Sequence, residues 1–103
     1  MHAEHLLAAL RMHRAHDADE ARHVADTSAF ILRHLTGMWW HRSTLEGHVT
    51  ASAWVVDDSG EHALLLHHAK LNRWLQPGGH LDAGDATTAH GALREAIEET
   101  GLH

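Results

Sequence analysis

Leucine residues recur at helical spacing over residues 6–10, which predicts a first helix. Asp17 predicts the start of a second helix, because a side-chain oxygen can cap the first turn and the acidic residues that follow suit that end. The apolar face of the second helix covers residues 24–35, and Gly37 is placed to end it. The favoured role of this helical pair is packing on the rest of the domain, with a cap or a dimerisation element as alternatives.

After the helical pair the pattern changes from helical to alternating. Residues 48–56 alternate as in a strand with one buried face. A turn cluster separates them from residues 62–67, whose continuous apolar run predicts a second strand buried on both faces. These two strands are expected to pair as a hairpin. Residues 74–76 predict a short third strand that Pro77 ends.

A last helix is predicted near the end of the chain, where an apolar stripe over residues 89–97 is expected to face a core. At 3.6 residues per turn, Glu95, Glu98 and Glu99 fall together on the opposite face. Repulsion between Glu95 and Glu99 costs a few tenths of a kcal/mol, which a bound cation would offset. Taken alone, an acidic helix face is interpreted as a solvated surface.

The segment before this helix is rich in glycine and is predicted to be a turn. Gly78 and Gly79 allow backbone conformations closed to other residues, so backbone groups can approach a ligand closely. Asp85 or Thr87 can cap the helix, and Gly101 suits the left-handed position past its end. Hard cations such as Mg²⁺ prefer carboxylate and carbonyl oxygens and share the phosphates of substrates. The turn and the acidic helix together therefore predict a Mg²⁺–diphosphate site.

Composition excludes several classes of function. The 103 residues leave room for one domain, and the net charge of −6 argues against partners that are nucleic acid polymers. No apolar run approaches the ~20 residues that span a bilayer, so no membrane partner is expected. The absence of cysteine fits a reducing cytoplasm. The fourteen histidines are scattered without zinc-ligand spacing, and a histidine-driven pH or metal sensor ranks last.

Two adjacent tryptophans, Trp39 and Trp40, stand beside Arg42 in the connector after the helical pair. Such residues can stack on a nucleic acid base. They can also anchor the helical pair to the rest of the domain. The anchor is the favoured interpretation, because large aromatic side chains are usually buried.

The glycine-rich turn and the acidic helix resemble the signature of the Nudix hydrolase family. That signature is glycine, five residues, glutamate, seven residues, and then Arg-Glu-aliphatic-x-Glu-Glu-x-Gly-aliphatic. Here Gly79 opens the motif, Asp85 stands where glutamate is usual, and eight residues rather than seven lead to Arg94. The Arg-Glu, Glu-Glu and Gly-Leu elements match within residues 94–102. The resemblance covers residues 47–103.

By this resemblance, Glu98 and Glu99 are expected to be the principal ligands of Mg²⁺, with Mn²⁺ as an alternative ion. Glu95 is implied to be a further ligand or the general base that activates water. The Gly78 carbonyl is expected to complete the coordination shell of the cation. Gly101 belongs to the structural part of the motif.

The resemblance also implies an orienting role for Arg94, through a pair with Asp85 or with a carboxylate of the helix. Aspartate is one methylene shorter than glutamate, and the extra loop residue can compensate for this. Gly79 is implied to be structural. Arg73 and His80 flank the mouth of the site and are candidates for binding phosphate or base, with ordinary surface roles as the alternative.

The implied fold is α/β, with an N-terminal helical extension over residues 1–45 of a single domain. Residues 46–103 are expected to form the first part of a Nudix α/β/α sandwich, which contains a mixed sheet and a loop–helix–loop. Because further strands and a second helix follow the motif in that family, the sandwich is expected to be truncated. Three alternatives follow: the chain is a fragment, a second copy completes it as a homodimer, or it folds poorly.

The implied function is Mg²⁺-dependent hydrolysis of a pyrophosphate linkage in a small-molecule nucleoside diphosphate derivative. The alternative is a non-catalytic binding or regulatory module that retains the motif, or an inactive fragment.

Overall fold

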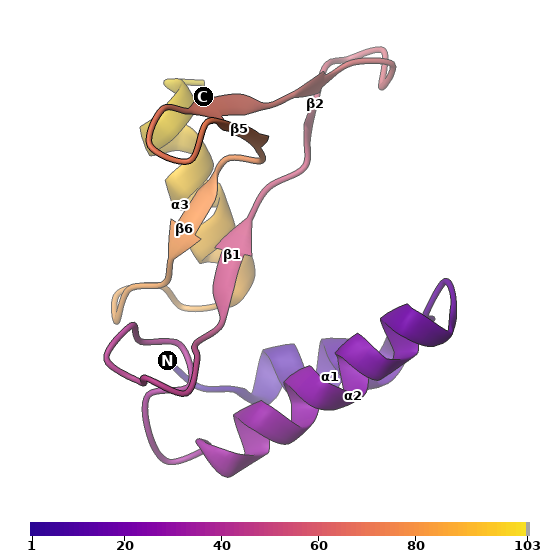
Figure 1. The fold of residues 1–103 in the computed structure, drawn as a ribbon, viewed down its shortest axis with the longest axis vertical. Coiled ribbons are helices and arrows are strands. Elements are labelled where there is room, and N and C mark those ends of the chain that lie inside the picture. The colour runs from indigo at the N-terminus through magenta and orange to yellow at the C-terminus, as the bar shows by residue number, and fades with distance from the viewer. Residues whose placement is uncertain (103) are drawn as a thin grey trace.

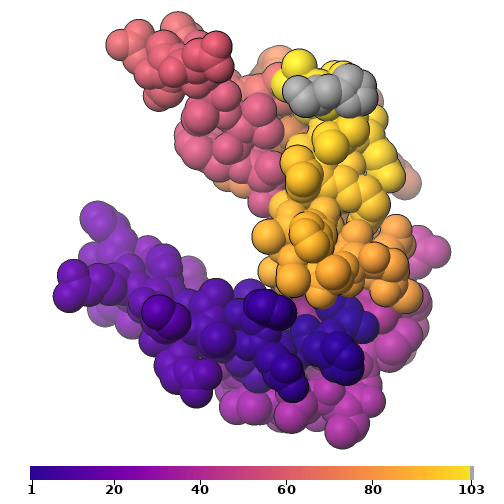
Figure 2. Space-filling view, turned by 180° about the vertical axis from the view of Figure 1, so that it is seen from behind, coloured from indigo at the N-terminus to yellow at the C-terminus, as the bar shows by residue number. Residues whose placement is uncertain are grey.

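A computed structural model describes residues 1–102, which contain three helices and six short strands. The helical pair lies at one end of the molecule, and α3 (Thr88–Thr100) lies at the other end against β1 and β6 (Figure 1). From behind, the molecule is open between the helical pair and the projecting hairpin, and the outer face of α3 is uncovered (Figure 2). The α/β fold expected from the sequence is confirmed. None of the helices in the described residues has the length and apolarity to cross a membrane.

The helical pair consists of α1 (Glu4–Met12) and α2 (Ala18–Arg33). The predicted cap of α2 is confirmed, because the Asp17 side chain accepts a hydrogen bond from the backbone N–H of Glu20. The predicted stop at Gly37 is wrong, since α2 ends at Arg33 and His34 already leaves the helical conformation. The His34 ring packs on Phe30, one turn earlier, and its Nε2 lies 2.9 Å from Oε2 of Glu46, beyond the helix.

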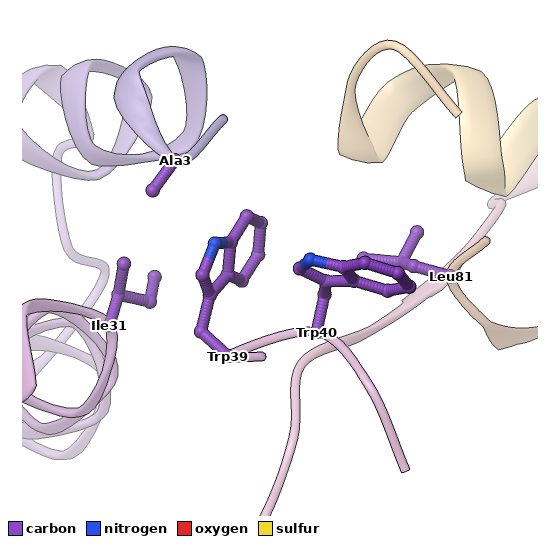
Figure 3. Close-up of a cluster of buried hydrophobic side chains, with 5 residues drawn as sticks. All are labelled: Ala3, Ile31, Trp39, Trp40 and Leu81. Atoms are coloured by element: carbon purple, nitrogen blue, oxygen red, sulfur yellow. The ribbon is translucent and has the colours of Figure 1, made fainter. Parts of the chain in front are cut away.

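The core joins the helical pair to the rest of the domain (Figure 3). Trp39 is 1% exposed and Trp40 is also buried. They pack between Ala3 and Ile31 of the helical region and Leu81, which follows β6. This burial confirms the interpretation of the two tryptophans as an anchor.

Strand β1 (Thr50–Ser52) pairs antiparallel with β6 (Gly78–His80), so part of the predicted turn is instead a strand. The missing side chain of Gly78 explains this difference. A Cβ on Gly78 would lie 2.5 Å from the carbonyl oxygen of Ala51 and 2.5 Å from the Cβ of Ser52. Only glycine lets the two strands approach so closely.

The other strands form two short ladders, β2 (Val55–Val56) with β3 (Ala63–Leu64), and β4 (Leu66–His68) with β5 (Arg73–Leu75). The expected hairpin is confirmed by the β2–β3 pair, although each of the two predicted long strands is broken in two. The predicted burial of the second strand on both faces is wrong, since Leu65 is 41% exposed. Separate two-stranded ladders leave faces that nothing covers.

Helix α3 ends as the sequence predicts, and Thr87 rather than Asp85, of the two candidate caps, begins it. The Thr87 side chain caps it by accepting from the backbone N–H of His90, and Gly101 adopts the left-handed conformation past its end. The predicted apolar stripe is partly wrong, because Leu93 is 57% exposed, whereas Gly91 and Ala96 are buried. The small residues of α3 face β1 and β6, which allows the helix to pack closely on these strands.

Candidate functional site

The packing of α3 on β6 brings two of the predicted acidic residues onto the glycine backbone. Oε2 of Glu99 accepts a hydrogen bond of 3.1 Å from the backbone N–H of Gly78. A Cβ on Gly79 would lie 3.1 Å from the carboxyl carbon of Glu95, so that glycine makes room for the carboxylate. The structure therefore places Glu95 and Glu99 against β6, although the sequence predicted them on the face away from the core.

The backbone N–H and C=O groups of Gly78 point away from its partner strand β1. The backbone N–H of Ala53 donates to the carbonyl of Pro77 at 2.8 Å, which continues the β1–β6 register. Hydrogen-bonded and non-hydrogen-bonded positions alternate along an antiparallel pair. The N–H and C=O of Gly78 consequently face the free edge of β6, where Glu99 takes the N–H. The Gly78 carbonyl, predicted as a metal ligand, is thus not used in pairing with β1.

Arg94 is the centre of the polar network on α3. Its Nε and Nη2 donate to the two carboxylate oxygens of Asp85 at 2.9 Å and 3.0 Å. Its Nη1 reaches Oε1 of Glu95 at 3.1 Å and Oε2 of Glu98 at 3.3 Å. Nη2 also donates to the carbonyl oxygen of His80. One guanidinium thus connects the loop, β6 and two of the three glutamates.

Asp85 is the buried charge that holds this network. It is 6% exposed, and it accepts a third hydrogen bond from the backbone N–H of Asp82 at 2.8 Å. The Arg94 guanidinium lowers the pKa of Asp85, and the Asp82 N–H lowers it further, against the opposite effect of burial. The same contact raises the pKa of Arg94. The pair of Arg94 with Asp85, one of the two pairings that the resemblance implied, is present and bidentate despite the shorter aspartate side chain.

One important residue of the site was missed in the sequence. Gly91 is buried in α3, where a Cβ would lie 2.3 Å from Cδ2 of Leu81 and 2.9 Å from Oδ2 of Asp85. Its missing side chain lets the loop over residues 81–85 lie against the helix and positions Asp85 beside Arg94. A glycine inside a helical pattern, which usually has a packing reason, was the available signal.

The two candidates for substrate binding have different surroundings. His80 ends β6, and its ring lies 5.1 Å from that of His48, while its carbonyl is joined to Arg94. Arg73 begins β5 opposite His68, and its side chain makes no hydrogen bond or ion pair within the described residues. The structure connects His80 to the network of Arg94 and leaves Arg73 outside it.

The donor set fits a hard cation by its chemistry. Three carboxylates of α3 and a backbone carbonyl are the oxygen donors that Mg²⁺ prefers. Within residues 1–102, however, no group of three histidine, aspartate or glutamate side chains is arranged to hold a metal ion. Arg94 pairs with Glu95 and Glu98, while Glu99 bonds to the Gly78 backbone. In the described residues, the positive charge beside the carboxylates of Glu95 and Glu98 is the guanidinium of Arg94.

Residues 46–103 match the sequence model of a family described as NUDIX domain. The matched span is more than half of the chain and includes all six strands and α3. The helical pair lies outside it. Searches of curated proteins and of solved structures found no match.

Proposed function

This chain belongs to the Nudix family, and on that premise we propose that it hydrolyses a pyrophosphate linkage in a nucleoside diphosphate derivative with Mg²⁺. Nudix domains act in general on pyrophosphate bonds. The single observation that carries the proposal is the set of three carboxylates on α3, of which Glu95 and Glu99 lie against the glycine backbone of β6, while Arg94 contacts Glu95 and Glu98. We further propose the cytoplasm as the location of the reaction, which the absence of cysteine fits.

The proposed metal ligands are Glu98 and Glu99, with the Gly78 carbonyl and Glu95 beside them. Mg²⁺ or Mn²⁺, when bound, supplies neutralising charge for the transferred phosphoryl group and orients a water molecule. Among the glutamates that Arg94 contacts, Glu98 is the more exposed and the more distant, at 3.3 Å. Glu98 can therefore leave the guanidinium of Arg94 and bind a metal ion at a small cost in free energy.

Glu95 is the candidate for the base that takes a proton from water. Its side chain is mostly buried, lies against Gly79 and is held by Arg94. A base that is fixed in this way can stay in place while a water molecule is activated. Arg94 and Asp85 act as positioning residues in this proposal, since their bidentate contact fixes the side from which Arg94 reaches the glutamates.

A non-catalytic binding or regulatory module is the second candidate. It is favoured by the contacts of Arg94, which engages Glu95 and Glu98 at the same time. A guanidinium that remains there would compete with a divalent cation for the same oxygens. In this case the chain would bind a diphosphate compound without cleaving it.

The test is Mg²⁺-dependent release of phosphate or nucleotide from a panel of nucleoside diphosphate derivatives. The parent protein is compared with Glu98→Gln and with the control Glu61→Gln, an exposed glutamate in the β2–β3 turn. We expect Glu98→Gln to lose about 100-fold in rate, as for other groups that act on developing charge, and Glu61→Gln to match the parent. Absence of activity in a folded parent supports the module instead.

A further inference from the structure

A cavity of about 580 Å³ lies next to the β1–β6 pair. Its walls are β1, the end of β5 and the start of β6, together with Leu65. This volume is within the range of small-molecule sites, which are about 300–1,000 Å³. It is lined by Gly78 and Gly79, the two glycines that contact the glutamates of α3. The cavity therefore begins where the proposed diphosphate site ends.

One wall of the cavity is a tryptophan that the fold leaves uncovered. Trp74 is 65% exposed, although large aromatic side chains are usually buried. His67 supports it from the neighbouring strand, with ring centroids 5.0 Å apart in an edge-on arrangement. Trp54 is 64% exposed but does not line this cavity. The position of Trp74 on the cavity wall, and not its exposure, distinguishes the two residues.

The cavity also contains a fixed polar group. The hydroxyl of Ser52 donates to Oε1 of Gln76 at 2.9 Å, and both residues line the cavity. This bond holds the carboxamide of Gln76 in one orientation, with its NH₂ group available to a ligand. A fixed polar group beside an aromatic side chain can orient an organic molecule.

The separation between Trp74 and Gly78 suits a ligand with an aromatic group at one end and a phosphate group at the other. Trp74 and Gly78 are four residues apart, so at most about 14 Å of extended chain separates them. The N–H of Gly78 is bonded to Glu99. A molecule that contacts Trp74 at one end can thus reach the α3 carboxylates at the other.

We propose that this cavity binds the aromatic base of the substrate, that Trp74 stacks on it, and that Gln76 hydrogen-bonds to its edge. The proposal rests on the proposed function and names the residues that would bind the base of its nucleoside substrate. Diphosphates that carry a flat aromatic group are preferred over those with an aliphatic or polyol group. Stacking accounts for this preference, because every base has a flat face that an exposed indole can cover.

The first test compares Trp74→Leu with the matched control Trp54→Leu on two substrates. One substrate is the β-methyl ester of adenosine diphosphate, and the other is dimethyl diphosphate, which lacks the base. We expect Trp74→Leu to raise KM about tenfold for the adenosine ester, with kcat unchanged, and to leave dimethyl diphosphate hydrolysis as in the parent. Trp54→Leu changes neither. Equal effects of the two variants, or an equal effect on both substrates, overturn the proposal.

The second test does not depend on catalysis. AMP without metal is titrated into both variants while tryptophan fluorescence is recorded. Because Trp39 and Trp40 are buried, Trp74 is the exposed indole in Trp54→Leu. Saturable quenching in Trp54→Leu that is lost in Trp74→Leu supports the base site, even if the parent hydrolyses nothing and the proposed function fails. Quenching that persists in Trp74→Leu overturns the base site, even if the parent is active.

Discussion

Two regions of the molecule are held together by different forces. The core around Trp39 joins the helical pair to the domain by burying apolar side chains. The network around Arg94 joins α3 to the preceding loop and to β6 by charged hydrogen bonds. The two regions meet in one short loop, where Leu81 belongs to the core and Asp85 belongs to the network. The candidate site therefore depends on both regions, although only the network around Arg94 contains the proposed functional groups.

Removing the centre of the apolar core is expected to have the largest effect. Trp39→Ala leaves a cavity between the helical pair and Leu81, and we expect a loss of about 3–5 kcal/mol in the free energy of unfolding. That is a large part of the stability of a small domain. Urea denaturation measures it, with the exposed Trp54→Ala as control, for which a change within about 0.5 kcal/mol is expected. Similar losses in both variants would contradict the role of Trp39 as anchor.

A smaller effect is expected where β1 and β6 approach. Gly78→Ala places a methyl group 2.5 Å from the backbone of Ala51, so the strands must separate. We expect a loss of about 2–3 kcal/mol. Gly84→Ala is the matched control, since nothing lies within 4 Å of its Cβ position. If Gly78→Ala is as stable as Gly84→Ala, the close strand pairing is wrong.

Breaking the charged network is expected to lower the stability of the fold less than the two preceding substitutions do. It is expected to lower activity more than this loss of stability explains. Asp85→Asn removes the carboxylate that Arg94 grips with two bonds, and we expect a loss of about 2 kcal/mol in stability. Arg94 is then free to bind the glutamates more tightly, so activity should fall further than stability alone explains. Denaturation and kcat measured on the same samples separate the two effects. Unchanged kcat would show that Asp85 does not position the site.

The smallest effect concerns acidic pH. Because the pKa of Asp85 is lowered in the folded protein, its contribution to stability is present above the unfolded value, near ~3.9, and is lost as the pH falls through the folded value. The difference in unfolding free energy between the parent and Asp85→Asn should therefore be constant from pH 7 to 5 and shrink below pH 4. A difference that grows as the pH falls would contradict the direction of the shift.

Local rules predicted three helix ends correctly, although the stop predicted at Gly37 was wrong. Asp17, Thr87 and Gly101 each occupy the capping position that the sequence indicated, because a cap depends on a few neighbouring residues. The contact between Arg94 and Asp85 could also be predicted, but only through the family resemblance. The assigned roles of the glutamates stay predictions.

Long-range packing decided what the sequence could not. Leu93 belongs to the most apolar stripe of α3 and is exposed, because Gly91 lets another face of the helix approach the loop. The glycine segment predicted as a turn pairs with β1, since a missing side chain at Gly78 permits a contact with a strand some twenty-five residues earlier in the sequence. Neither contact leaves a local periodic pattern.

The acidic face of α3 is proposed to hold the metal ion for hydrolysis of a diphosphate. The most direct measurement is the Mg²⁺ concentration that gives half-maximal hydrolysis, compared between the parent, Glu99→Gln and Glu61→Gln. We predict that Glu99→Gln raises this concentration at least tenfold, because a proposed ligand is lost, and that Glu61→Gln leaves it unchanged. Hydrolysis that proceeds equally without Mg²⁺, or equal Mg²⁺ requirements in all three proteins, would contradict the claim.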